Sequence, residues 1–225
     1  MTRILLFLLF LFSGSAVGQS HYEKYLELNK GIIMKKDSLL NEYNSECLEE
    51  KDAIIIHSQE FLFNTVTGDI FSYWYGTPWD FNGHSKIPQQ GTIACGYFVT
   101  TVLLHAGFNV PRIKWAQSAS EIFIKKLAPH NIKRFHNKPV SDVVKYLNDT
   151  GPGLYLVGLD NHVGFITVKN DSIHFVHANY YEPDIGVMSQ KIDSENPLRD
   201  SKYRIIGKLL TDEMVIKWLQ NTPYE

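Results

Sequence analysis

Two residues of this chain have the chemistry of a nucleophile and a general base, Cys95 and His162. Cys95 follows a short loop and opens an apolar segment that predicts a helix ending near Gly107. The free N–H groups and the dipole at a helix N-terminus stabilise a thiolate, so we expect the Cys95 thiol to ionise more easily than a free one. A cysteine in an apolar helix is also commonly a buried structural residue, and Cys95 alone does not decide between the two interpretations.

His162 opens a segment, residues 162–169, whose β-branched and aromatic composition predicts a strand. A strand behind the helix is a rigid mount for a base, and Gly164 leaves room beside the imidazole. Taken alone, a histidine at the start of a strand is more commonly a surface residue. Together with Cys95 it predicts acyl transfer, in which the two share a proton or form an ion pair and the sulfur forms a thioester.

A hairpin is expected to bring a third polar residue to His162. A two-residue turn at residues 170–171 would oppose His162 to Asn179 and place His177 one diagonal step away on the same face. Either His177 or Asn179 can therefore orient the imidazole. Asp160 shares that face, although a solvated turn carboxylate is its simpler interpretation.

The elements that must position these residues follow from periodicity and turn signals. Helices are predicted within residues 21–51, over 52–66 with Asp52 as N-cap and Gly68 as its end, from a capping box at residues 118–121 to about 127, and from Ser141 to about 147. Strands are predicted over residues 153–159, 162–169, 173–180, 186–192 and 203–210, before a last helix over 212–220. Helices followed by antiparallel strands indicate an α+β domain.

Four segments, in order, resemble the NlpC family of papain-like cell-wall peptidases. They are residues 76–83 (GTPWDFNG), 94–99 (ACGYFV), 162–165 (HVGF) and 176–178 (VHA). The family reads roughly G-T-P-Y-x-W-G-G, D-C-S-G-F-V, H-V-G-I and I-H-A, so the resemblance covers about residues 52–180. It implies a papain-like core of N-terminal helices packed on an antiparallel sheet.

The resemblance also implies an activity and its residues. Matched position by position, the nucleophile is Cys95, the base is His162 and the orienting residue is His177. The implied reaction is hydrolysis of amide bonds in peptidoglycan stem peptides, with no metal or organic cofactor.

Departures from the family pattern concern the substrate rather than the nucleophile or base. Ala94 and Gly96 replace the Asp and Ser that flank the family cysteine, and Trp79 replaces a tyrosine but can still donate from its indole N–H. Residues 69–75 and residues 114–137 are long for a minimal family member, and both segments are expected to shape the cleft. The residues expected to bind substrate are Trp79, Asn82, Tyr97 and Asn179.

Two alternatives to a cell-wall peptidase stay open. A papain-like hydrolase could act on another amide or on an ester, such as an acyl lipid. The domain could instead be a non-catalytic binding module of the cell envelope, which would not need an intact Cys, His and His set.

The whole chain limits these possibilities. Its 225 residues, 44% hydrophobic and 20% charged, are typical of a globular protein, and a net charge of -2 gives no indication of a nucleic-acid surface. Residues 1–18 have the form of a signal peptide, with Arg3 before an apolar run and small residues at its end. A helical segment over 19–51 and a catalytic domain over 52–225 would follow.

This leader predicts export to the periplasm or the exterior, without stable membrane insertion after cleavage. The oligomeric state is not indicated by the sequence. Cys47 is expected to remain unbonded to Cys95, because a disulfide would remove the nucleophile.

Overall fold

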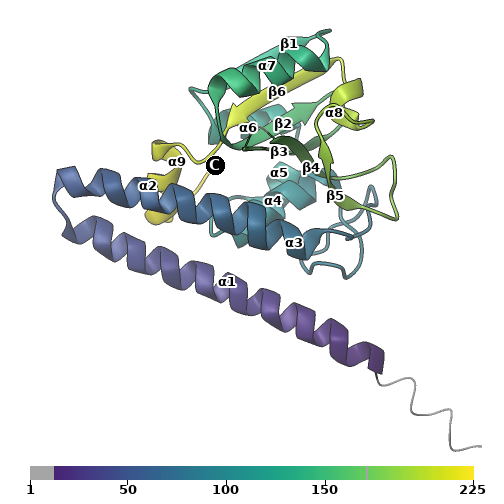
Figure 1. Ribbon diagram of the computed structural model, residues 1–225. Coiled ribbons are helices and arrows are strands. Elements are labelled where there is room, and N and C mark those ends of the chain that lie inside the picture. The colour runs from purple at the N-terminus through teal and green to yellow at the C-terminus, as the bar shows by residue number, and fades with distance from the viewer. Residues whose placement is uncertain (1–12, 171) are drawn as a thin grey trace, which may run out of the picture.

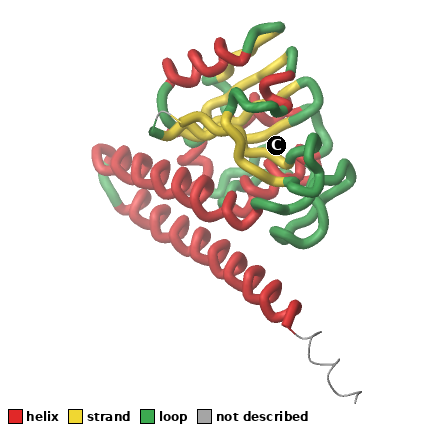
Figure 2. Tube along the Cα trace, turned by 45° about the vertical axis from the view of Figure 1, so that its right-hand side comes forward, coloured by secondary structure: helices red, strands yellow, loops and turns green. Residues whose placement is uncertain are grey.

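The protein combines helices with one antiparallel sheet, as the α+β prediction states (Figures 1 and 2). The computed structural model describes residues 13–170 and 172–225. The helices are α1 (Ser13–Ser45), α2 (Leu48–Asn64), the π-helical turn η1 (Thr65–Ile70), α3 (Phe71–Trp74), α4 (Cys95–His105), α5 (Arg112–Ala116), α6 (Ser120–Leu127), α7 (Val140–Thr150), α8 (Pro197–Asp200) and α9 (Asp212–Leu219). The strands are β1 (Ile132–His136), β2 (Gly153–Leu159), β3 (Val163–Lys169), β4 (Ser172–Ala178), β5 (Val187–Lys191) and β6 (Tyr203–Lys208).

The sheet has the order β1-β6-β2-β3-β4-β5, and each neighbouring pair is antiparallel. Successive side chains of β2 point to opposite faces. Leu154 and Leu156 enter a core shared with α4 and α6, while Tyr155 and Val157 enter a second core beneath α7. Both faces of the central strands are therefore buried, and α7 lies on the face away from α4 (Figure 1).

Helix α1 is part of the first core. Tyr25, Ile32 and Leu39 recur every seven residues and are buried there, which places them on one stripe of the helix. The Lys36 ammonium donates hydrogen bonds to the Gly107 carbonyl at 2.8 Å and to Asn221 Oδ1 at 2.9 Å. The predicted segment 19–51 is thus packed against the rest of the chain rather than held apart from it.

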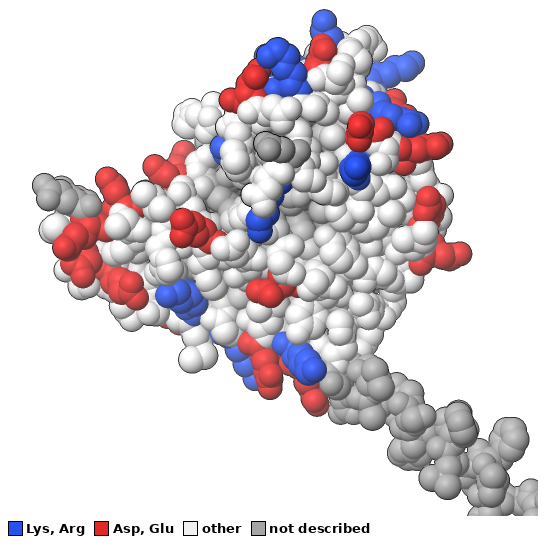
Figure 3. Space-filling view, in the orientation of Figure 1, with Lys and Arg blue, Asp and Glu red and all other residues white. Residues whose placement is uncertain are grey.

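Most of the predicted signal peptide, residues 1–12, lies outside the described residues. Among the helices that the structure does describe, none is both long and apolar enough to cross a membrane. Figure 3 shows Lys and Arg interspersed with Asp and Glu on the face in view, with acidic side chains gathered where α1 turns into α2. This mixed charge agrees with the near-neutral composition.

The predicted boundaries of the second helix were wrong at both ends. Helix α2 starts at Leu48 with Cys47 as N-cap, not at Asp52, and the helical path continues through Gly68 to Trp74. A single glycine costs a helix only about 1 kcal/mol relative to alanine. The continuation outweighs that cost because it buries three side chains beyond the glycine, those of Ile70, Phe71 and Trp74.

The expected side-chain caps do not form either. The N-cap of α6 is Ala119 and the N-cap of α7 is Pro139, and neither has a side-chain cap hydrogen bond. Glu121 is drawn away from a capping role by Lys125 at 2.7 Å and Arg134 at 2.8 Å. Tertiary ion pairs have displaced the local capping box.

The predicted strands are correct to within two residues at each end. The prediction missed β1 and the short helices α5 and α8. Strand β1 is at the sheet edge and buries only Phe135, so it lacks the hydrophobic alternation that marks a strand in sequence.

Candidate active site

Cys95 is the first residue of α4, as the sequence indicated. The helix is anchored by buried apolar residues, including Phe98, Val99 and Val102, and it packs on β3 and β4. A Cβ atom at Gly96 would overlap the carbonyl oxygen of Ala116 in α5. The glycine at this position, where the resembled family has serine, is therefore required by close packing of α5 on the start of α4.

Both cysteines are free, as expected. Cys47 is exposed and Cys95 is half-buried.

The two predicted histidines meet behind Cys95. His162 immediately precedes β3, His177 lies in β4, and the two strands form a hairpin in which Phe165 opposes Val176. His162 Nε2 and His177 Nδ1 are 2.9 Å apart, and the side chains are 4% and 0% exposed. The hairpin geometry expected from the sequence thus brings these imidazoles into direct contact.

Asn179 and Asp160, the other residues considered as partners of His162, are engaged elsewhere. Asn179 donates from Nδ2 to Met188 Sδ at 3.2 Å and accepts from the Tyr181 backbone N–H at 3.0 Å. The exposed Asp160 carboxylate accepts from the Ser201 hydroxyl at 2.9 Å and from backbone N–H groups beyond it. Of the three alternatives, only His177 contacts the His162 imidazole.

Packing fixes the His177 ring. Phe175 stacks on it with ring centroids 4.1 Å apart and an interplanar angle of 15°. A Cβ atom at Gly164 would lie 2.9 Å from His177 Cβ and 2.6 Å from the Phe175 ring. The sequence predicted that Gly164 leaves room beside His162. In the structure a side chain at this position would collide with His177 and Phe175, so packing requires the glycine.

A pocket of 360 Å³ opens where Cys95 and His162 meet. Its wall is completed by residues from the α5–α6 region and the β2–β3 turn, chiefly Ala116, 118–121, Phe123, 159–163 and Tyr203. The α5–α6 residues fall within the long segment 114–137 that was expected to shape the cleft. Cys95 and His162, the predicted nucleophile and base, thus line one concave surface, and His177 is not part of its lining.

The His162 Nδ1 atom is buried and has no hydrogen-bond partner. None of the hydrogen bonds among the described side chains joins the Cys95 sulfur to His162. Catalytic hydrogen bonds are often long without substrate and shorten in the reactive complex. The His162 ring thus has one nitrogen without a partner, and His162 lines the same pocket as Cys95.

Burial governs protonation at this site. It raises the pKa of the Cys95 thiol, and the N–H groups of Val163, Gly96 and Cys95 itself offset this only in part. The expectation of an easily ionised thiol was therefore wrong, because desolvation outweighs the helix N-terminus.

The histidines are affected in the opposite direction. Burial lowers the pKa of His177 to about 4, and burial together with the nearby His177 holds the pKa of His162 well below its usual value. At neutral pH the site contains a neutral thiol and two neutral imidazoles.

The residues expected to bind substrate lie outside the 360 Å³ pocket. Trp79 lies one aromatic ring away from the histidines: its ring centroid is 5.9 Å from that of Tyr180, which is 5.1 Å from that of His162. Trp79 Nε1 is also buried without a hydrogen-bond partner. The indole is thus a free donor close to the histidine pair.

Tyr97 and Asn82 are further removed from this chemistry. The Tyr97 hydroxyl accepts from Gln117 at 3.0 Å, and the Arg112 guanidinium lies 4.8 Å above its ring. Asn82 is exposed in a turn, where its backbone N–H donates to Asp80. Neither side chain is brought to the histidines.

Sequence reasoning missed Gln190. Its Oε1 atom lies 3.0 Å from His177 Nε2, on the far side of the ring from His162. In the β4–β5 ladder His177 opposes Met188, so Gln190 is the next residue on the same face. The predicted strand over 186–192 contained the signal for this contact. Alternate residues of a strand lie on one face, so any even-numbered residue of this strand that faces His177 places Gln190 on the same face.

A larger cavity lies elsewhere. It measures 810 Å³ and lies at the opposite end of β2 and β3, between α2 and α9. Its wall contains no cysteine, and its histidine, His130, is exposed. We assign the candidate site to the smaller pocket, because that pocket brings together a cysteine and a buried histidine. Among the described residues, no cluster of His, Cys, Asp or Glu is arranged to hold a metal ion.

No family model matches this chain, and comparisons with curated proteins and with solved structures find no similar protein. The resemblance to cell-wall peptidases therefore rests on the four motifs and on the geometry of the residues in them.

Proposed function

We propose that this chain is an exported cysteine hydrolase of papain-like type that cleaves amide bonds in peptidoglycan stem peptides. The observation that carries the proposal is that Cys95 and His162 line one pocket, while His177 holds Nε2 of His162 and Nδ1 has no partner. A general base needs one nitrogen that is held in orientation and one nitrogen that is free to take the proton of the nucleophile. The four motifs supply the substrate class.

The proposed reaction starts from the neutral pair. As the Cys95 sulfur attacks the substrate carbonyl, its proton moves to His162 Nδ1 and the carbonyl electrons move to oxygen. The tetrahedral intermediate collapses to a thioester, and the leaving amine takes the proton from Nδ1. Water then attacks the thioester in the same way, giving its proton to His162 and restoring the thiol.

The N-terminus of α4 supplies electrostatic stabilisation. The Cys95 backbone N–H has no partner within the helix, because the first N–H groups of a helix lack one. It can donate to the oxyanion that forms on the attacked carbonyl. Burial disfavours a thiolate in the resting enzyme. The hydrogen bond from the Cys95 N–H to the oxyanion therefore matters most in the transition state, where negative charge develops.

Mass analysis of peptidoglycan fragments incubated with the purified protein tests the proposal. We expect new amine and carboxyl termini within the stem peptides, and no products from the Cys95→Ser variant. Intact fragments, together with cleavage of another amide or ester, would identify a different hydrolase.

Thiol labelling distinguishes an enzyme from a binding module. Although the thiol of Cys95 is neutral at rest, an amidase-directed electrophile should label it faster than the exposed Cys47, because His162 takes the thiol proton as the sulfur attacks; Cys47 serves as an internal control. Equal labelling, with no hydrolysis of any fragment, would favour the binding module.

A further inference from the structure

We propose that Gln190 is a positioning residue that fixes which nitrogen of each imidazole carries the proton, so that Nδ1 of His162, a residue that lines the pocket together with Cys95, keeps its lone pair. The protonation pattern stands by itself, whereas its catalytic consequence rests on the proposed function.

The hydrogen bond between Gln190 and His177 has only one possible direction. Gln190 Oε1 carries no proton, so at 3.0 Å it can only accept from His177 Nε2. A neutral imidazole has one N–H, which leaves His177 Nδ1 as an acceptor. His162 Nε2, 2.9 Å away, must then donate to it.

The same rule settles the last nitrogen. Because His162 uses its one proton at Nε2, its Nδ1 atom has a bare lone pair, and this atom is buried without a partner. Both rings are neutral because burial lowers the pKa of each. One amide oxygen therefore determines the polarity of two imidazoles, and reversing it would place a proton at Nδ1, where His162 could not accept another.

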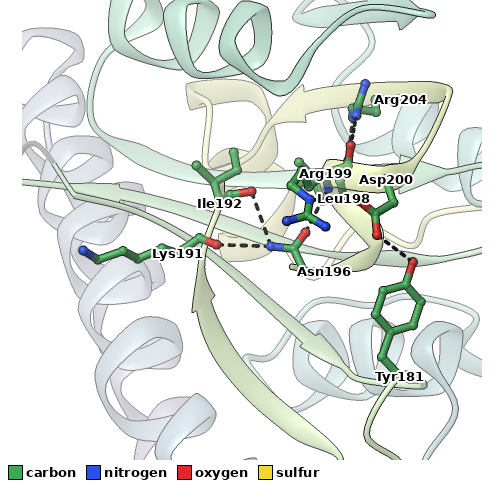
Figure 4. Close-up of polar contacts among 8 residues, drawn as sticks. All are labelled: Tyr181, Lys191, Ile192, Asn196, Leu198, Arg199, Asp200 and Arg204. Carbon is green, nitrogen blue, oxygen red and sulfur yellow. Dashed lines mark hydrogen bonds and ion pairs between the residues drawn. The ribbon is translucent and has the colours of Figure 1, made fainter. Parts of the chain in front are cut away.

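The backbone that follows Gln190 is held firmly. Asn196 Nδ2 donates to the carbonyls of Lys191 at 3.1 Å and Ile192 at 3.3 Å, as Figure 4 shows. Asn196 also caps α8, accepting from the Arg199 N–H at 2.9 Å. The guanidinium of buried Arg204 in turn donates to the α8 carbonyls of Leu198 and Arg199, both at 2.7 Å.

This clamp ties the end of β5 to α8 and β6. Tyr181, one residue beyond the tyrosine that touches His162, donates to Asp200 of α8 at 3.2 Å (Figure 4). Segments on both sides of the histidine pair are thus fixed to the same short helix. Gln190 is held within hydrogen-bond reach of His177 by packing as well as by its own contact.

Nuclear magnetic resonance of the imidazole nitrogens in the full chain tests the pattern directly. At pH 7 we expect both His162 and His177 to be protonated at Nε2, with assignments made from His162→Asn and His177→Asn variants. A wild-type spectrum with His177 protonated at Nδ1 would overturn the proposal, and it requires no substitution in Gln190.

Three variants measure the role of the oxygen. Gln190→Leu removes the acceptor and should give a mixture of both protonation forms, with kcat about threefold to tenfold lower, the range that one lost neutral hydrogen bond provides. Gln190→Glu keeps an acceptor and should keep the Nε2–H form. Gln59→Leu is the matched control, because that glutamine donates to Asp212 far from the site; it should change neither spectrum nor kcat.

These outcomes separate the two proposals. If the spectra behave as expected but no amide or ester is cleaved, the proposed function fails and the role of Gln190 in protonation stands. If substrate is cleaved while Gln190→Leu leaves both spectrum and kcat unchanged, Gln190 is not a positioning residue.

Discussion

Helix α4 has a histidine network near each end. The two networks differ in whether the Nδ1 atom of the histidine has a hydrogen-bond partner. At the C-terminal end, His105 Nδ1 and the Tyr25 hydroxyl are hydrogen-bonded at 2.8 Å, and that hydroxyl accepts from Trp74 Nε1 at 2.8 Å. At the N-terminal end, His162 contacts His177, which contacts Gln190. Nδ1 of His105 has a hydrogen-bond partner, whereas Nδ1 of His162 has none among the described residues.

Burial does not distinguish the two networks. It lowers the pKa of His105 to about 4, as it does for His177. A perturbed histidine is thus a poor guide to function when structural networks perturb histidines equally. A better indication of function is a ring nitrogen without a partner on a histidine that lines a pocket together with a cysteine. Of His105 and His162, only His162 has this feature.

The largest expected effect on kcat in either network is that of removing His162, the proposed base. His162→Ala removes the proton acceptor for the thiol and the donor for the leaving amine, so kcat should fall about 10²–10⁴-fold. Cys95→Ser should abolish turnover while leaving the fold intact. Hydrolysis of a cleaved muropeptide, with the melting temperature of each variant, measures this. Wild-type rates in folded His162→Ala would show that His162 is not the base.

We expect a smaller loss of kcat on replacing His177, because its proposed role is to orient His162 and not to contact substrate. His177→Ala should lower kcat less than His162→Ala does, because the thiol still has its base. His177→Gln should recover part of the loss, since a glutamine oxygen can accept from His162 Nε2. Equal damage by Ala and Gln would assign His177 a packing role beside Phe175 instead.

The other network should affect stability and not activity. Tyr25→Phe leaves His105 Nδ1 and Trp74 Nε1 without partners, which should cost about 1–3 kcal/mol of unfolding free energy. Tyr73→Phe is the matched control, because its ring lies 5.0 Å from Tyr25 outside this hydrogen-bond chain. Urea unfolding and kcat measured on both variants check this. A kcat loss in stable Tyr25→Phe would contradict the division of roles.

The last prediction concerns the pH dependence of stability, and it leaves activity at neutral pH unchanged. The pKa of His177 is about 4 when folded and its ordinary value is 6.5, so below pH 6.5 the unfolded chain binds more protons. Stability should therefore fall on acidification from pH 6.5 towards 4, by about 1.4 kcal/mol per pH unit for this group. His177→Gln should flatten the curve by that amount. An identical slope in wild type and His177→Gln would contradict the buried, neutral state of this ring.

The sequence by itself determined the parts of this protein that depend on local periodicity. The β-branched and aromatic composition located the central strands, and the two-residue turn fixed the parity that puts His162 and His177 on one face. The apolar segment after Cys95 placed that residue at the start of α4. These features are readable because neighbouring residues determine turn geometry and the side on which each side chain lies.

The tertiary structure decided what depends on contacts between distant segments. It continued the helix past Gly68 to fill the core, and it selected His177 over Asn179 by occupying the Asn179 amide. It raised the pKa of Cys95, because desolvation is set by everything packed around the thiol rather than by its place in a helix. It also brought Gln190 to His177, a contact that required the pairing of β4 with β5 and not merely the prediction of each strand.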